Sequence, residues 1–196
     1  FILPTGKYIG NSRYKDVFAA STTADLTSFR NHWGAETSLD VALYRPVARY
    51  ELVAKDVATF LNKLSTGGLK GESFTARVKY SDYLPTGYNL WDDVPKNSLM
   101  YMEYKVAFER PADGTKDLQL GFDYVLTDAG ETVPIPVELE ILNEKNEVLA
   151  RTAFRIPCER GKNTTVRGNF LTSDINGGIG IDPDYDGDLE VDLGEL

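Results

Sequence analysis

The amino-acid sequence predicts a mainly β fold, an antiparallel β-sandwich with one or two short helices. Apolar and polar residues alternate with a period of two in a series of short runs, which is the spacing of strands with one buried face. Gly, Pro, Asn and Asp separate these runs, as they do between the strands of a sandwich. A helical period of apolar residues stands out in one segment.

The predicted strands follow one another along most of the chain. They cover residues 39–53, 74–80, 99–108, 118–126, 137–142 and 148–156. Pro46 interrupts the first of them, and because proline has no N–H to donate, we place it at a bulge or a sheet edge. Residues 143–147, between the last two strands, are a predicted hairpin turn.

The predicted helix begins after Asp56, whose carboxylate can accept hydrogen bonds from the free N–H groups of the first turn. The glycine pair at 67–68 ends it. A second short helical turn is predicted within residues 14–20. The apolar residues of the main helix share one face: Val57, Phe60, Leu61 and Leu64.

The charge distribution excludes two classes of partner. The 196 residues carry a net charge of −9, and eight acidic residues with no Lys or Arg lie in the segment 173–196. Binding of nucleic acid needs clustered Lys and Arg, so we predict no nucleic-acid partner. The acidic tail also argues against contact with an anionic membrane surface.

We treat residues 1–196 as one β-sandwich unit. The alternative is that residues 1–60 are the remnant of a truncated N-terminal sandwich. The chain begins at Phe1 rather than Met, so we expect that an upstream piece with any export or lipid signal was removed. No apolar run is long enough for a membrane helix, and we expect membrane contact only through a lipid anchor absent from this chain.

The acidic segment 173–196 contains two short strand patterns. Leu189, Val191 and Leu193 alternate with acidic residues, and Ile179 and Ile181 flank a glycine. One interpretation is that these strands pair at the edge of the chain's own sheet. The other is that the last strand is exchanged and completes the sheet of a neighbouring subunit by β-strand addition.

The same segment resembles the first half of an EF-hand calcium loop. Asp182, Asp184 and Asp186 occupy the spacing of the first three ligands, with Asp188 two residues beyond. The pattern then fails, because Leu193 stands where a bidentate glutamate is required. A solvated acidic turn is therefore the main interpretation, and a weak calcium site is the alternative.

No catalytic or cofactor-binding motif is present. His32 is the only histidine and lies in a polar loop, and Cys158 is the only cysteine, for which we predict a buried thiol. The sequence lacks the glycine-rich, Walker and zinc-protease motifs. We predict that the protein is not an enzyme and needs no cofactor.

The aromatic-rich loop 83–95 is the remaining candidate for a ligand site. Tyr83, Tyr88 and Trp91 combine apolar rings with polar tips, which suits contact with a sugar or a protein. The main interpretation is that the rings pack this loop onto the sandwich.

Several segments together resemble the fimbrillin-like lipoproteins, the major fimbrial subunits and fimbrial-type adhesins of Bacteroides-type Gram-negative anaerobes. The most specific are the Leu-x-Arg-Pro strand at 43–46 and the Asn-Thr-x-Val-x-Gly-x-Phe-Leu-Thr strand at 163–172. Further segments that carry the resemblance are 14–20, 41–50, 84–89, 124–126 and 179–188.

The resemblance implies transthyretin-like, Greek-key β-sandwiches, export to the outer membrane, and a structural or adhesive role at the cell surface. It also implies assembly by strand exchange with other fimbrial subunits or copies of itself, and contact with a host glycan or protein. The alternative function that we retain is a calcium-linked or carbohydrate-binding surface module.

Overall fold

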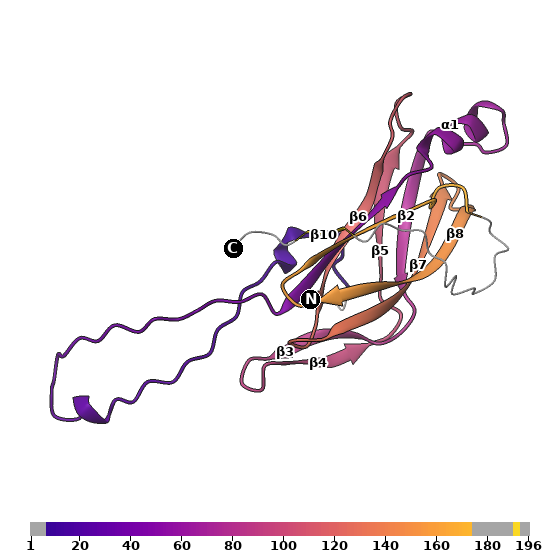
Figure 1. The fold of residues 1–196 in the computed structure, drawn as a ribbon. Helices are drawn as coiled ribbons and strands as arrows, with labels where there is room; N and C mark the ends of the chain where they lie inside the picture. The colour runs from indigo at the N-terminus through magenta and orange to yellow at the C-terminus, as the bar shows by residue number, and fades with distance from the viewer. Residues whose placement is uncertain (1–6, 174–189, 193–196) are drawn as a thin grey trace.

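The structure, a computed structural model, describes residues 7–173 and 190–192 and confirms the mainly β, sandwich-like fold. Figure 1 shows two sheets facing each other, with strand orders β10-β9-β1-β6 and β5-β2-β7-β8, and a separate hairpin of β3 and β4. In chain order the elements are η1 Arg13–Lys15, η2 Thr27–Phe29, β1 Val47–Ala54, α1 Val57–Ser65, β2 Ser73–Tyr80, β3 Leu84–Asn89, β4 Val94–Leu99, β5 Glu103–Glu109, β6 Leu118–Leu126, β7 Thr132–Asn143, β8 Val148–Glu159, β9 Asn163–Gly168 and β10 Glu190–Asp192.

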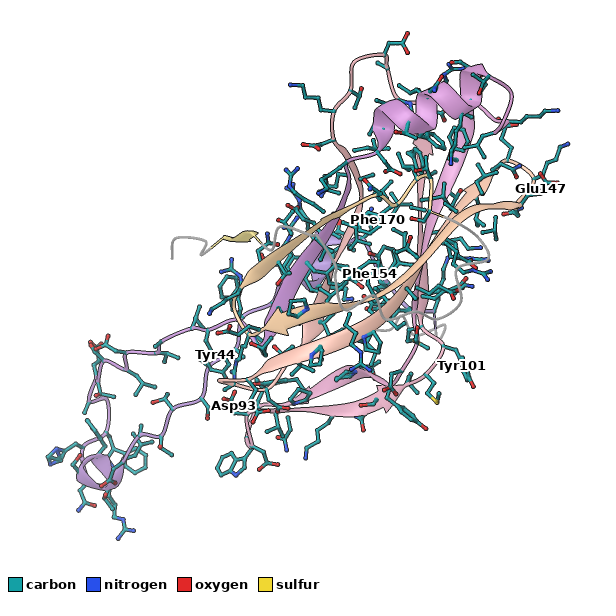
Figure 2. All side chains as sticks on the ribbon, turned by 45° about the vertical axis from the view of Figure 1, so that its right-hand side comes forward. Tyr44, Asp93, Tyr101, Glu147, Phe154 and Phe170 are labelled. Carbon is teal, nitrogen blue, oxygen red and sulfur yellow. The ribbon has the colours of Figure 1, made fainter. Side chains whose placement is uncertain are left out.

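The core lies between the two sheets. Every second residue of β2 is buried, as the period of two predicts. Side chains from both sheets, such as Leu52 of β1 and Ile141 of β7, belong to one buried cluster. Phe154 and Phe170 stack within it with ring centroids 5.3 Å apart (Figure 2). Burial of each large apolar side chain contributes about 1.5–3 kcal/mol.

One strand pair differs from the predicted antiparallel arrangement. β1 pairs antiparallel with β6 but parallel with β9. After β8 the chain crosses from the second sheet to the first, and it enters β9 in the direction of β1. An alternation of apolar residues does not encode strand direction, which is why the sequence missed this pair. β1 thus lies between β6 and β9; that residues 1–60 are the remnant of another sandwich stays a prediction.

The helix α1 is confirmed, but its predicted cap is wrong. Val57, Phe60 and Leu61 are buried, and Leu64 packs against the core. The Asp56 side chain makes no capping bond. Its carboxylate instead accepts hydrogen bonds from the backbone N–H of Leu171 and Thr172 and from the Thr172 hydroxyl, at 2.7–3.2 Å.

The predicted strands 39–53 and 99–108 need correction. The first begins only at Val47, after Pro46, and residues 39–43 are exposed and extended. The second is divided at Tyr101, which has a positive φ of 60° and lies between β4 and β5. The predicted helical turn in 14–20 is a 3-10 turn over Arg13–Lys15.

The hairpin at 143–147 is confirmed. β7 and β8 pair antiparallel and are longer than predicted. The Asn143 side chain accepts hydrogen bonds from the N–H groups of Lys145 and Glu147, and Asn146 adopts the positive φ of 61° that asparagine tolerates in turns.

Candidate functional site

A long excursion of the chain projects from one end of the sandwich. Residues 20–43, which we call the arm, leave and rejoin the body at a bridge between Ala19 and Tyr44, whose backbone groups exchange two hydrogen bonds of 2.8 and 2.9 Å. Figure 1 shows the arm extending away from both sheets. Beyond Ala20, Phe29 is the arm's single half-buried residue, and the others are exposed. The arm therefore presents nearly all of its side chains to its surroundings.

The tip of the arm is a turn that carries a tryptophan. The Asp25 carboxylate accepts a hydrogen bond from the N–H of Thr27 at the start of η2, which fixes the first part of the turn. Trp33 follows and is 96% exposed. His32 lies beside it, also exposed, with its N–H donated to the carbonyl of Phe29. His32 and the buried Cys158 therefore do not meet.

The arm also carries exposed apolar residues where a strand was predicted. Leu39, Val41 and Leu43 alternate along an extended stretch and are each about half exposed or more, between 45% and 64%. The structure assigns no strand to residues 39–43. Exposed apolar residues gathered on one segment are suited to lie against another surface.

The predicted aromatic loop folds as the β3–β4 hairpin, which is a correction to its interpretation as a loop. The sequence did not predict these strands because each contains a proline, Pro85 or Pro95, and proline argues against a strand. Trp91 lies in the turn and is 85% exposed, and Tyr83, just before β3, is 62% exposed. Tyr88 instead packs against the small cluster around Val47 and Tyr124.

A group of four side chains joins the hairpin to the root of the arm, and we call it the Asp93 clamp. Arg160, from the turn between β8 and β9, donates two hydrogen bonds to the Asp93 carboxylate, at 2.7 and 2.9 Å. The hydroxyls of Tyr44 and Tyr88 donate to the same carboxylate. Figure 2 shows Tyr44 and Asp93 together where the arm meets the body.

The electrostatics of the clamp are those of a tightly paired carboxylate. The hydrogen bonds from Arg160, Tyr44 and Tyr88 hold the pKa of Asp93 well below its usual range. Burial and the bond to Asp93 raise the pKa of Tyr88. The Arg160 guanidinium also stacks over the Tyr44 ring, 4.2 Å from its centroid. The Asp93 carboxylate therefore stays ionised at neutral pH.

Sequence reasoning missed the clamp. Asp93 and Arg160 are 67 positions apart, and each lies in a turn where a charged residue needs no explanation. Only the positive φ of Asp93, 58°, singles it out once the structure is known. No local pattern in the sequence could have paired these two residues.

The predicted calcium and strand-exchange residues fall mostly outside the described residues. Asp182, Asp184, Asp186 and Asp188 lie there, as do Leu189 and Leu193. Val191 lies in β10 and pairs with Thr164 of β9, in an antiparallel register at the end of the first sheet. Calcium binding and strand exchange both stay predictions.

Cys158 lies in the core, where burial and the charge of Asp123 raise the pKa of its thiol to about 12. Across residues 7–173 and 190–192, no group of three or more His, Cys, Asp or Glu side chains is arranged to hold a metal ion. The same part of the chain contains no helix long and apolar enough to cross a membrane.

The fold and its projections define a β-sandwich module with exposed aromatic loops. The chain belongs to a family of unknown function, DUF6562, whose model matches residues 1–194. No curated protein matches the sequence. A solved chain described as a "putative cell adhesion protein" from Bacteroides ovatus ATCC 8483 is similar at 13% identity with a TM-score of 0.36, over 65% of this chain and 40% of that chain. This chain thus spans less than half of that protein, and the resemblance to fimbrillin-like proteins stays a prediction.

Proposed function

We propose that the protein is a non-catalytic structural or adhesive protein of the cell surface, and that the arm and the β3–β4 hairpin form its binding end. The observation that carries this proposal is the position of the two tryptophans. Trp33 and Trp91 are the only tryptophans in the chain, and both are almost fully exposed in the turns of these two projections.

Exposed tryptophans of this kind need a physical reason. A tryptophan left in water forgoes the favourable free energy of burying its large apolar surface. Tryptophan is also among the residues that contribute most to protein interfaces when a partner covers them. The Asp93 clamp supports the proposal because it fixes the hairpin to the root of the arm, which limits the entropy that binding would have to overcome.

The test is binding of the labelled full chain to cultured epithelial cells, measured by flow cytometry. We expect Trp33→Ser and Trp91→Ser each to weaken binding about tenfold or more, the range of an interface hot spot. The matched control is Tyr101→Ser, which removes an aromatic ring that is 84% exposed but lies away from the Asp93 clamp (Figure 2). Binding that is unchanged in both tryptophan variants would contradict the proposal.

The second candidate function, a carbohydrate-binding module, is favoured by the exposure of Tyr83 and Trp91, which lie beyond the two ends of β3. Aromatic faces stack on the apolar faces of sugar rings. A glycan array probed with the full chain and with Trp91→Ser distinguishes a sugar ligand from a protein ligand. Discrete glycan signals that disappear in the variant would favour the carbohydrate function.

We further propose that subunits of this protein assemble as a fimbria by β-strand addition through residues 189–193. The position of β10 supports this, since it is a three-residue edge strand beside β9. A strand donated by a neighbour would satisfy the same backbone groups of β9. Deletion of residues 188–196 should abolish polymers seen by electron microscopy while the monomer keeps its β-sheet circular dichroism. Polymers that persist after the deletion would exclude this mode of assembly.

A further inference from the structure

A lysine and an aspartate meet inside the core of the sandwich. Lys15, in η1, has a side chain that is 3% exposed, and that of Asp123, in β6, is fully buried. Lys15 Nζ lies 2.6 Å from Oδ1 of Asp123. The hydroxyls of Tyr8 and Tyr80 each donate a hydrogen bond of 2.7 Å to Oδ2. The N-terminal segment is thereby joined to a strand 108 positions away.

Joining the two segments by a buried ion pair has a high desolvation free energy. Removing an ammonium and a carboxylate from water carries a large desolvation cost for each ion, which their attraction offsets only in part. Burial lowers the pKa of Lys15, while the charge of Asp123 opposes that change. A neutral amine beside a neutral carboxylic acid, or a product without charges, avoids this cost.

We propose that Lys15 Nζ and Asp123 Cγ condense into an amide, an intramolecular isopeptide bond between the N-terminal segment and β6. The reaction joins an ammonium and a carboxylate and releases one water, so charge and atoms balance and no redox partner is needed. The buried surroundings favour the uncharged amide. Nothing in the proposed adhesive function depends on this bond.

The Tyr8 hydroxyl is placed to move the protons. It accepts a hydrogen bond of 2.7 Å from Lys15 Nζ and donates one of 2.7 Å to Asp123 Oδ2. One proton passes along this path to Oδ2, which leaves a neutral amine beside a carboxylic acid. The Nζ lone pair then forms the bond to Cγ, as the carbonyl electrons move onto Oδ1. The nearness of the two groups supplies the effective concentration that the reaction needs.

The remaining groups stabilise the intermediate and its breakdown. The backbone N–H of Tyr124 donates a hydrogen bond of 2.9 Å to Oδ1 and can stabilise the negative charge that develops there. A second proton passes from nitrogen through Tyr8 to Oδ2. The Cγ–Oδ2 bond breaks, and Oδ2 leaves as water. Tyr80 keeps its hydrogen bond to the departing oxygen.

The same molecule contains an internal control. Lys162 and Glu159 also lie 2.6 Å apart, but both side chains are about one-third exposed. Water solvates both ions there and competes with condensation. We therefore expect an amide at Lys15 and Asp123 and none at Lys162 and Glu159.

The test is the intact mass of the full chain under denaturing conditions. We expect a mass lower than that of the sequence by one water, and a proteolytic fragment in which the peptides containing Lys15 and Asp123 are joined. The full sequence mass, with Lys15 and Asp123 recovered in separate peptides, would overturn the proposal.

Two variants separate the chemistry from simple packing. Lys15→Arg keeps a positive charge but lacks the nucleophile, so its mass should equal that of its sequence. Tyr8→Phe interrupts the proton path, and we expect it to slow the mass loss at least tenfold in freshly purified protein. Tyr104→Phe is the matched control, because its buried hydroxyl bonds to Tyr50 and, among the residues that the structure describes, has no hydrogen bond to Asp123. Equal rates of mass loss in the two tyrosine variants would contradict the assigned role of Tyr8.

Discussion

At the scale of single residues, Glu140 illustrates how a buried charge is held on the outer face of a sheet. It lies on β7, and its carboxylate receives hydrogen bonds from Arg77 and Arg151 and an ion pair from Lys79 at 3.0 Å. Burial would raise the pKa of Glu140, but the bonds from Lys79, Arg77 and Arg151 outweigh it and lower that pKa to about 2.

We predict a pH-dependent contribution of Glu140 to stability. Because its pKa is lower in the folded than in the unfolded protein, the contribution is fully present above the ordinary pKa of 4.5 and is lost as the pH falls through about 2. The shift corresponds to about 3 kcal/mol at pH 7. Urea unfolding should show Glu140→Gln destabilised by that order at pH 7, with the difference reduced by more than half at pH 3.

Exposed Glu131, in the connection between β6 and β7, supplies the control for this prediction. Glu131→Gln should change stability little at either pH. A gap between Glu140→Gln and the parent chain that stays constant from pH 7 to pH 3 would contradict the role assigned to the three cations.

Asp56 correctly marks the start of the helix α1, but its predicted role as the helix cap is wrong. It stands at the N-terminus of a helix, where aspartate commonly caps. The segment after β9 returns to this place, and the N–H groups of Leu171 and Thr172 bind the carboxylate instead. This partner is more than a hundred positions away, so no window of sequence contains it.

At the scale of elements, the arm is separable from the sandwich. Residues 22–41 contribute no buried side chain, and the Ala19–Tyr44 bridge closes the loop beneath them. We predict that a short glycine–serine turn in place of residues 22–41 shifts the melting temperature by about 3 °C or less, as changes confined to a surface do. Differential scanning calorimetry measures this shift, and binding to epithelial cells should be lost. An unfolded product would mean that the arm belongs to the folding unit.

The elements that the sequence predicted well are those whose burial follows a simple period. The strand at 118–126 is found at its predicted bounds as β6, and α1 has its predicted apolar face. β3 and β4 were missed because a two-stranded hairpin beside the main sheets has no regularly buried face. The strand predicted over residues 39–43 was wrong for the opposite reason. Apolar and polar residues do alternate there, but nothing in the described chain covers the apolar residues.

At the scale of the whole molecule, the two ion-paired connections come from residues far apart in the sequence. The Asp93 clamp and the Lys15–Asp123 pair each join turns or strands across the fold. The sequence could identify Tyr83 and Trp91 as candidate ligand-site residues, because aromatic residues in a turn-rich stretch are unusual. The Asp93 clamp and the Lys15–Asp123 pair could not be predicted in this way, because ion pairing depends on topology that alternation does not encode.

The parallel pairing of β1 with β9 has a mechanical consequence. Force that enters β1 at Val47 and leaves β9 at Gly168 pulls two parallel neighbours in opposite directions along their length. Their ladder of hydrogen bonds is then loaded in shear, and all the bonds must yield together instead of opening one after another. A module joined into a chain through these two ends would resist stretching far better than a module of equal thermodynamic stability whose terminal strands separate one hydrogen bond at a time.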